Sequence, residues 1–180
     1  MDIKLFTIQN KKILKLLDNN KPYYANFNNV ISKRSNLYTP YKDMAKYYNW
    51  TNAPIFCASM EPGYVSYIHG YAAPKNEAIG LLLSVPEKYI KRQYYYDWTD
   101  YIYFTEFRNE FYEGAKEGYT FEQFKQDVFD CTNLGSYQIF QYTIPYINPK
   151  WIIKKFDDIS FINNFDYITD EVKPIILGNE

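Results

Sequence analysis

The sequence predicts a single α+β domain, and three of its segments indicate this class. Residues 3–9 alternate polar and apolar side chains, as a half-buried strand does, and lead directly into apolar residues at helical spacing. An uninterrupted apolar run at 79–85 predicts a buried strand in the middle of the chain. Residues 120–129 combine a helix-capping sequence with a periodic apolar face. The 180 residues, 47% of them hydrophobic, suit one buried core, so we expect one domain over residues 1–180.

The first half of the chain predicts a strand, a helix and a second strand-and-helix unit. Asn10 is a good helix cap after the first strand, and the polar cluster 18–22 ends the helix that follows. Residues 37–40 could close a short strand before a helix whose apolar face runs over 41–48. The apolar segment 54–58 then predicts a buried strand.

The second half predicts two helices followed by two strands. Pro86 ends the apolar run and is a favourable residue for a first helical turn, so we expect a helix across the aromatic-rich residues 89–112. Thr120 caps the next helix. Residues 137–144 alternate as a strand, and residues 151–156 resume as a paired strand.

Composition and charge argue against several classes of protein. The formal net charge is -1, which provides no overall attraction to a phosphate backbone, although a local basic patch remains compatible with it. Cys57 and Cys131 lie far apart with no second Cys or His at ligand spacing, and His69 is the single histidine, so we do not expect a structural zinc site. The N-terminus has no signal-peptide pattern and no apolar run is long enough to span a bilayer, so we expect a cytoplasmic protein without membrane contact.

Four short motifs occur in an order that resembles an uncharacterised bacterial family, domain-of-unknown-function family 3841. They are Leu5–Gln9, Tyr38–Met44 leading to Pro54–Phe56, Val85–Pro86 followed by Tyr96–Trp98, and Gln141–Ile144. The similarity extends from Leu5 to about Phe156, and it rests on the order of the motifs.

The same segments also look like a divergent ADP-ribosyltransferase fold. This resemblance implies two small, mostly antiparallel sheets around a cleft with flanking helices. It also implies NAD as the substrate, with Thr7 and Gln9 on an early strand as its polar contacts. Tyr38 or Tyr41 would stack on nicotinamide, and Gln141 would occupy the late-strand position that normally supplies a catalytic Glu.

The chemistry of such a transferase requires a carboxylate that Gln141 cannot provide. Cleavage of the nicotinamide bond passes through an oxocarbenium-like centre, which a nearby anion stabilises. The Gln141 amide can hydrogen-bond a ribose hydroxyl but cannot act as a general base. We therefore consider Glu61, Asp97 and Asp100 as the missing acid; Asp97 lies beside Trp98, which could border a pocket and raise the carboxyl pKa.

Each of these residues also has a purely structural interpretation. Thr7 and Gln9 could be ordinary polar positions of a half-exposed strand, and Asp97 and Trp98 could be the outer and inner faces of an amphipathic helix. Tyr38, Tyr41, Tyr47 and Tyr48 could pack in the core rather than form a stacking wall. His69 could be solvated in a loop, and we assign it no catalytic role. Lys88, Lys91 and Arg92 could be a solvated helix face rather than a guide for a nucleic acid.

Two functions follow from the sequence. The first is an ADP-ribosyltransferase-like enzyme that uses NAD, without a metal, to modify a macromolecular target as a toxin or a phage-defence or counter-defence factor. The alternative is a non-catalytic interaction protein that binds a protein or nucleic-acid partner through an aromatic surface, since aromatics make up 21% of the chain. Biased codon usage is a third explanation of the many Tyr, Phe, Asn and Lys residues.

Overall fold

A computed structural model of the chain describes residues 1–28, 35–68, 74–132, 138–162 and 165–178. The strands are β1 (Asp2–Asn10), β2 (Ile55–Ser59), β3 (Val65–Tyr67), β4 (Ala78–Pro86), β5 (Lys91–Tyr94), β6 (Ile139–Ile144), β7 (Ile152–Phe156) and β8 (Tyr167–Ile168). The α-helices are α1 (Leu14–Leu17), α3 (Tyr38–Tyr47), α4 (Tyr95–Glu106), α5 (Arg108–Gly114), α6 (Phe121–Asp130) and α7 (Lys173–Leu177). Short 3-10 helices include η1 (Lys11–Ile13), η4 (Glu87–Tyr89) and η5 (Pro149–Trp151).

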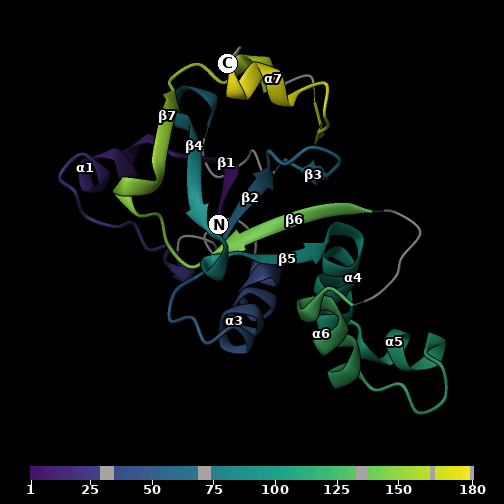
Figure 1. Cartoon of the computed structure of the whole chain (residues 1–180). Coiled ribbons are helices and arrows are strands. Elements are labelled where there is room, and N and C mark those ends of the chain that lie inside the picture. Colours follow the sequence, from purple (N-terminus) through teal and green to yellow (C-terminus); the bar gives the residue numbers. More distant parts are fainter. Residues whose placement is uncertain (29–34, 69–73, 133–137, 163–164, 179–180) are drawn as a thin grey trace.

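Among the described residues, eight strands form one sheet. Seven of them follow the order β7-β4-β1-β2-β6-β3-β8, and the eighth, β5, pairs with the edge of β6 opposite to β2. Helices α3, α4 and α6 lie together on one side of this sheet, α7 lies at the opposite end, and α1 lies beside β7 (Figure 1). The α+β class is thus confirmed. The two separate small sheets expected from the resemblance are not seen, because β2 pairs with strands of both groups and joins them into one sheet.

The junction at β2 depends on a side-chain hydrogen bond from β1. β2 pairs with β1 only through Leu5↔Ser59 and Phe6↔Ala58, and its first three residues pair with β6 instead. Beyond Phe6 the two strands diverge. There the Thr7 hydroxyl donates to the carbonyl oxygen of Phe56 at 2.8 Å, so that this buried backbone acceptor is satisfied where the strand ladder stops.

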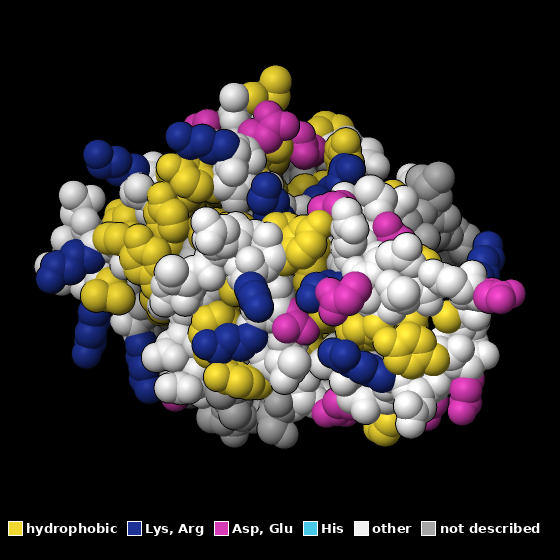
Figure 2. Space-filling view, turned by 90° about the horizontal axis from the view of Figure 1, so that it is seen from below, with side chains coloured by type: hydrophobic (Ala, Val, Ile, Leu, Met, Phe, Trp, Pro, Cys, Tyr) yellow, Lys and Arg dark blue, Asp and Glu magenta, His cyan; other side chains and the backbone are white. Residues whose placement is uncertain are grey.

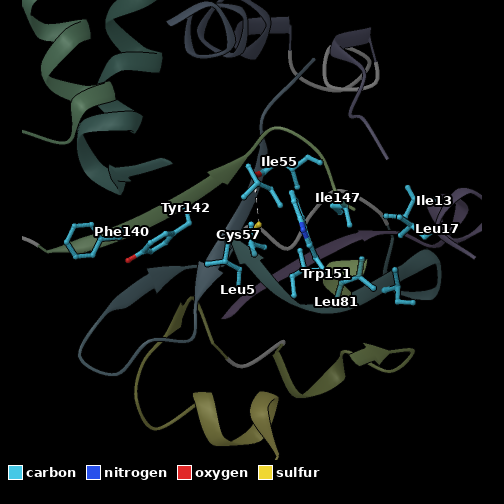
Figure 3. Close-up of a cluster of buried hydrophobic side chains, with 14 of the residues drawn as sticks. Leu5, Ile13, Leu17, Ile55, Cys57, Leu81, Phe140, Tyr142, Ile147 and Trp151 are labelled. Atoms are coloured by element: carbon cyan, nitrogen blue, oxygen red, sulfur yellow. Dashed lines mark hydrogen bonds between the residues drawn. The ribbon is translucent and has the colours of Figure 1, made fainter. Parts of the chain in front are cut away.

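One face of the sheet contacts a single hydrophobic cluster, which we call the central cluster (Figure 3). Strands contribute most of it, and η1, α1 and η5 close it. Its buried members are Leu5, Ile13, Leu17, Ile55, Cys57, Ile79, Leu81, Leu83, Val85, Tyr94, Phe140, Tyr142, Ile144, Ile147 and Trp151.

The opposite face contacts two clusters. The C-terminal cluster packs beneath α7 and comprises Phe6, Ile8, Ala58, Met60, Ile68, Ala78, Leu82, Ile159, Ile162, Ile168, Val172 and Ile176. The helical cluster packs beneath α3, α4 and α6 and comprises Met44, Phe56, Trp98, Tyr101, Phe111, Phe121, Phe124, Val128 and Phe129. Alternate residues of β2 therefore serve different clusters, as the two-residue period of a strand requires.

The local predictions differ from the structure in two places. Tyr38 begins α3 instead of closing a strand, because Pro40 is tolerated within the first helical turn. The helix expected over 89–112 is interrupted at its start by β5, whose pairing with β6 satisfies the backbone there. The capping box at Thr120 is confirmed: its hydroxyl accepts from the Gln123 N–H, and the Gln123 side chain accepts from the Thr120 N–H.

A buried lysine holds α7 against the loop that follows β2. Lys173 is 3% exposed, and its Nζ donates to the carbonyl oxygens of Glu61 and Tyr64 and to Oδ1 of Asp170. These three acceptors match the three N–H groups of an ammonium, which satisfies the buried charge. The ammonium and the Gly63 N–H together lower the pKa of the Asp170 carboxyl.

We expect Thr7→Val to destabilise the protein by about 1–3 kcal/mol, because it leaves the buried Phe56 carbonyl without its donor. Thr7→Ser keeps the hydroxyl and is the matched control, with a smaller loss for the missing methyl group. The free energy of unfolding in urea measures both. A Thr7→Val variant as stable as the original chain would show that the junction does not need this bond.

We also expect stability to fall on acidification in part through Asp170. A carboxyl whose pKa is lowered by folding contributes stability above its unfolded pKa, and that contribution is lost as pH falls through the folded value. Asp170→Asn should therefore flatten the loss of unfolding free energy between about pH 5 and about pH 2. Glu171→Gln, at an exposed neighbouring position, is the control and should leave the profile unchanged. An unaltered profile in Asp170→Asn would contradict the assignment.

Candidate functional site

The two β1 side chains predicted to contact NAD, Thr7 and Gln9, form hydrogen bonds within the protein. Thr7 is 2% exposed, and besides donating to Phe56 its hydroxyl accepts from the Gln9 amide at 2.9 Å. The hollow beside Thr7, bordered by β1, β2 and Ile68, has a volume of about 10 Å³. That is roughly the space of one water molecule. A nucleotide does not fit there in this conformation.

Gln141 belongs to a buried polar network on the helical side of the sheet. Its side chain is 0% exposed, and its Nε2 donates to Oε1 of Gln93 at 3.2 Å. Gln93 in turn donates to the hydroxyls of Tyr48 at 2.7 Å and Thr143 at 3.0 Å. The Tyr48 hydroxyl then donates to the carbonyl oxygen of Phe129 at 2.6 Å. The network links β6, β5, α3 and α6.

Thr7 and Gln141 point to opposite faces of the sheet. Thr7 lies directly across from Leu81, a member of the central cluster. Gln141 stands between Phe140 and Tyr142, which both belong to that cluster, so its own side chain points away from it. The structure therefore does not bring the early-strand and late-strand residues of the predicted cleft together.

The predicted stacking aromatics lie on the helical side. Trp98 is 2% exposed and contacts the half-buried Tyr41, with ring centroids 5.9 Å apart. Tyr38 is 38% exposed at the start of α3, and its ring meets Phe27 edge-on at 6.4 Å. Tyr41 and Trp98 thus lie on the same side of the sheet as the Gln141 side chain. Trp98 lies on the inward face of an amphipathic helix.

The candidate acids lie on two separate segments. Asp97 is half-buried in the first turn of α4, and Asp100 follows one turn later, where burial raises its pKa. Glu61 lies in the turn after β2, and its backbone N–H donates to the Ser59 hydroxyl at 3.0 Å. His69 lies outside the described residues.

A larger hollow of about 500 Å³ lies elsewhere, around the outer edge of β5, and we call it the β5 groove. Three segments line it: the end of α3, the start of β5, and the end of α6. The lining residues are Tyr47, Tyr48, Asn49, Ile90, Lys91, Arg92, Phe129, Asp130 and Cys131. Figure 2 shows the face that carries α3, α4 and α6, where basic, acidic and hydrophobic side chains alternate.

Two helix ends form the walls of the groove. α3 ends before Asn49 (φ 59°) and α6 ends at Cys131 (φ 55°), both in the left-handed conformation that commonly terminates helices. The hydrogen bond from Tyr48 to Phe129 ties the last turn of one helix to the last turn of the other. The Tyr47 hydroxyl adds a second tie, donating to Oδ1 of Asp130 at 2.7 Å.

Two basic side chains flank the β5 strand at the groove. The Lys91 Nζ lies 5.7 Å from the Tyr48 ring centroid, and the Arg92 guanidinium carbon lies 4.6 Å from that of Phe140. Both side chains are exposed, and within the described part of the chain neither forms an ion pair. Arg92 also lies against the Tyr142 and Cys131 side chains, and Lys91 lies on the other face of the strand, so an anionic group would meet both charges only at the outer strand edge.

Tyr47, Tyr48 and Cys131 of the groove are held in their protonated forms. Burial, with a smaller contribution from Asp130, raises the pKa of Tyr47 to about 12, and burial also raises the pKa of Tyr48. Burial raises the pKa of the Cys131 thiol, although the neighbouring Arg92 partly opposes the shift. A thiol with a raised pKa is a poor nucleophile at neutral pH.

Sequence reasoning identified the parts of this groove only separately. It grouped Tyr38, Tyr41, Tyr47 and Tyr48 as an aromatic wall and Lys88, Lys91 and Arg92 as a basic face. The groove contains two members of each group: Tyr47, Tyr48, Lys91 and Arg92. Sequence reasoning considered Cys131 only as a metal ligand and gave Asp130 no role, because their shared position at the end of a capped helix does not by itself indicate a site. It also placed Lys91 and Arg92 on a helix instead of on β5.

Comparisons with models of known protein families, with curated proteins and with solved structures found no match for this chain. Across the described ranges, no three His, Cys, Asp or Glu side chains are grouped as metal ligands. No helix in the same ranges has the length and apolar character needed to cross a membrane.

We expect Tyr48→Phe to destabilise the protein by about 1–3 kcal/mol, since it removes the donor to Phe129 and the acceptor for the Gln93 amide, both inside the fold. Tyr38→Phe, which removes an exposed hydroxyl, is the matched control and should change little. Urea denaturation compares the two. Equal stability of both variants would mean that the network does not hold the groove walls together.

Proposed function

We propose that this chain is a non-catalytic binding protein that holds an anionic group of its partner in the β5 groove. The observation that carries this proposal is that two exposed cations, Lys91 and Arg92, line a hollow of about 500 Å³ together with Tyr47 and Tyr48. Sites that bind small ligands or side chains commonly have volumes of about 300–1,000 Å³.

The chemistry of the groove suits anion recognition. Lys91 offers a compact ammonium, and Arg92 offers a planar guanidinium that can donate two parallel hydrogen bonds to a carboxylate or phosphate. Tyr47 is 37% exposed and supplies a rigid aromatic surface for an apolar or planar part of the partner. Asp130 on the opposite wall would favour a partner that also carries hydrogen-bond donors.

The same groups argue for binding rather than for covalent catalysis. A nucleophile or general base works best when its pKa lies near the working pH. In the groove the pKa values of Tyr47, Tyr48 and Cys131 are instead raised above their ordinary values. Asp130, the acidic group on the wall, already accepts a hydrogen bond from Tyr47.

The transferase that uses NAD remains a second candidate, favoured by the sequence resemblance. NAD contains a pyrophosphate and two aromatic rings, so it is also a suitable probe of the β5 groove. The two proposals differ in the outcome: a binding protein holds NAD or pyrophosphate without chemistry, whereas a transferase releases nicotinamide.

We expect pyrophosphate and NAD to raise the melting temperature of the protein and to bind in calorimetric titrations. Lys91→Ala combined with Arg92→Ala should weaken both affinities by about tenfold or more, because each loses a charge-assisted hydrogen bond. Lys46→Ala combined with Lys116→Ala, at exposed positions outside the groove, removes the same charge and should keep the affinity.

Two results would contradict the proposal. Binding that is absent, or that weakens equally in both double variants, would exclude the groove as a specific anion site. Nicotinamide released from NAD, measured by chromatography in the presence of a cell extract that supplies acceptors, would replace the binding protein with the transferase.

A further inference from the structure

The charges of this nearly neutral chain are separated in space. Residues 11–21 and 147–156 contain seven lysines and one acidic residue, a net charge of +6. Residues 95–130, which form α4 to α6, contain nine acidic and three basic residues, a net charge of -6. The net charge of -1 therefore conceals two regions of opposite sign.

The two lysine-bearing segments are far apart in sequence but packed together. Ile13 and Leu17 of the first segment share the central cluster with Ile147 and Trp151 of the second (Figure 3). The backbone of Tyr23 exchanges two hydrogen bonds with that of Ile147, at 3.0 and 2.9 Å.

An ion pair adds a third link between the segments. The Lys155 Nζ lies 2.6 Å from Oδ1 of Asp18, which pairs the single acidic residue of these segments. We call the resulting surface the basic end; its lysines are Lys11, Lys12, Lys15, Lys21, Lys150, Lys154 and Lys155.

Lys and Arg side chains gather around hydrophobic surface at the left of Figure 2. Figure 1 places α1 and β7 on that side of the molecule. All of the basic-end lysines except Lys11 are exposed. Lys155 is the member that forms an ion pair within the described residues. The other lysines are therefore free to contact an anionic partner.

A cluster of packed aromatic rings adjoins these lysines. Tyr24, 48% exposed, lies 5.2 Å from the Tyr146 ring at an interplanar angle of 31°. Tyr146 in turn stacks on Trp151 at 4.9 Å and 29°, directly after Lys150 in the chain. Lys88 lies 5.1 Å from the Tyr89 ring, which also contacts both Tyr146 and Trp151. Tyr24 is thus the exposed ring of this cluster, supported from behind by Tyr146.

We propose that the basic end binds single-stranded nucleic acid, with lysines on its phosphates and an unpaired base stacked on Tyr24. Proteins that bind single strands without sequence preference combine basic side chains along the backbone with aromatic rings on which bases stack. Lysines on the edge strand β7 also discourage edge-to-edge aggregation. That role requires no exposed tyrosine ring and no lysines on α1 and η5, so it does not account for the surface.

The test measures fluorescence anisotropy of a short labelled oligothymidylate with the full chain at low salt. Lys150→Glu combined with Lys154→Glu should weaken binding by about tenfold or more, because both phosphate contacts become repulsive. Lys46→Glu combined with Lys116→Glu makes the same change in net charge away from the basic end, and it should retain most of the affinity. The logarithm of affinity should fall linearly with the logarithm of salt concentration, by about 0.7 per contacted phosphate.

A second pair of variants isolates the stacking contact. Tyr24→Leu should lower the affinity by about fivefold or more, the lower range of one base–aromatic stack. Tyr112→Leu removes a tyrosine that is 54% exposed on α5 and should have no effect. The variant with Lys91→Ala and Arg92→Ala should keep oligonucleotide affinity, which separates this surface from the β5 groove.

Several outcomes would overturn the proposal. These are no binding by the original chain, equal losses in the two charge-reversal variants, or an unchanged affinity in Tyr24→Leu. Duplex DNA bound as tightly as the single strand, or anionic lipid vesicles bound in preference to it, would also overturn it, since neither partner offers an unpaired base.

Discussion

The architecture depends on β2 joining two groups of strands through only five residues. Its last two residues pair with β1 and its first three pair with β6, so the strands on either side must separate at Thr7. A backbone ladder cannot continue across that separation. The Thr7 hydroxyl replaces the missing ladder contact to Phe56, which keeps the sheet continuous while allowing it to change direction.

This change of direction determines where the helices and the β5 groove lie. Tyr142 and Thr143 of β6 pair with β2 on one edge and with β5 on the other. The side chains of Gln93 and Gln141 meet on the side of α3 and α6. The Tyr48 hydroxyl then joins this polar pair to the end of α6. The groove walls are thus positioned by hydrogen bonds that originate in the sheet.

The abundant tyrosines have a structural use that codon bias alone does not describe. In the helical region, several rings pack in or against the core while their hydroxyls reach a polar group at its border. Tyr101 donates to Asp43 at 2.6 Å, and Tyr119 donates to Asp127 at 2.5 Å. A phenylalanine would fill the same space without linking two helices or the two ends of one segment. These two tyrosines therefore combine apolar packing with a specific polar contact.

Sequence patterns predicted the elements whose signals are local. They failed where the structure of a segment depends on pairing with a distant strand. The alternation over 3–9, the apolar run 79–85 and the capping box at Thr120 each depend on neighbouring residues, and all three are confirmed as strands or a helix start. β5 could not be recognised, because Lys91 and Arg92 become a strand only through pairing with Tyr142 and Thr143 some fifty positions later. For the same reason, the alternation of β6 predicted that Gln141 points away from its neighbours in the strand. It did not predict which residues of other elements lie on the same side of the sheet.

The distribution of charge over the surface also depends on contacts between segments distant in sequence. The total of -1 suggested no attraction to polyanions, and each lysine-rich segment alone resembles a solvated surface. The packing of Ile13 and Leu17 against Ile147 and Trp151 brings together the lysines of two segments that are more than a hundred residues apart in the chain. Their positive electrostatic potentials then add. At an ionic strength of about 0.15 M, charges interact over only about 8 Å. The local density of lysines, and not the net charge of the chain, therefore sets the potential that a partner meets, and that density arises only when the central cluster forms.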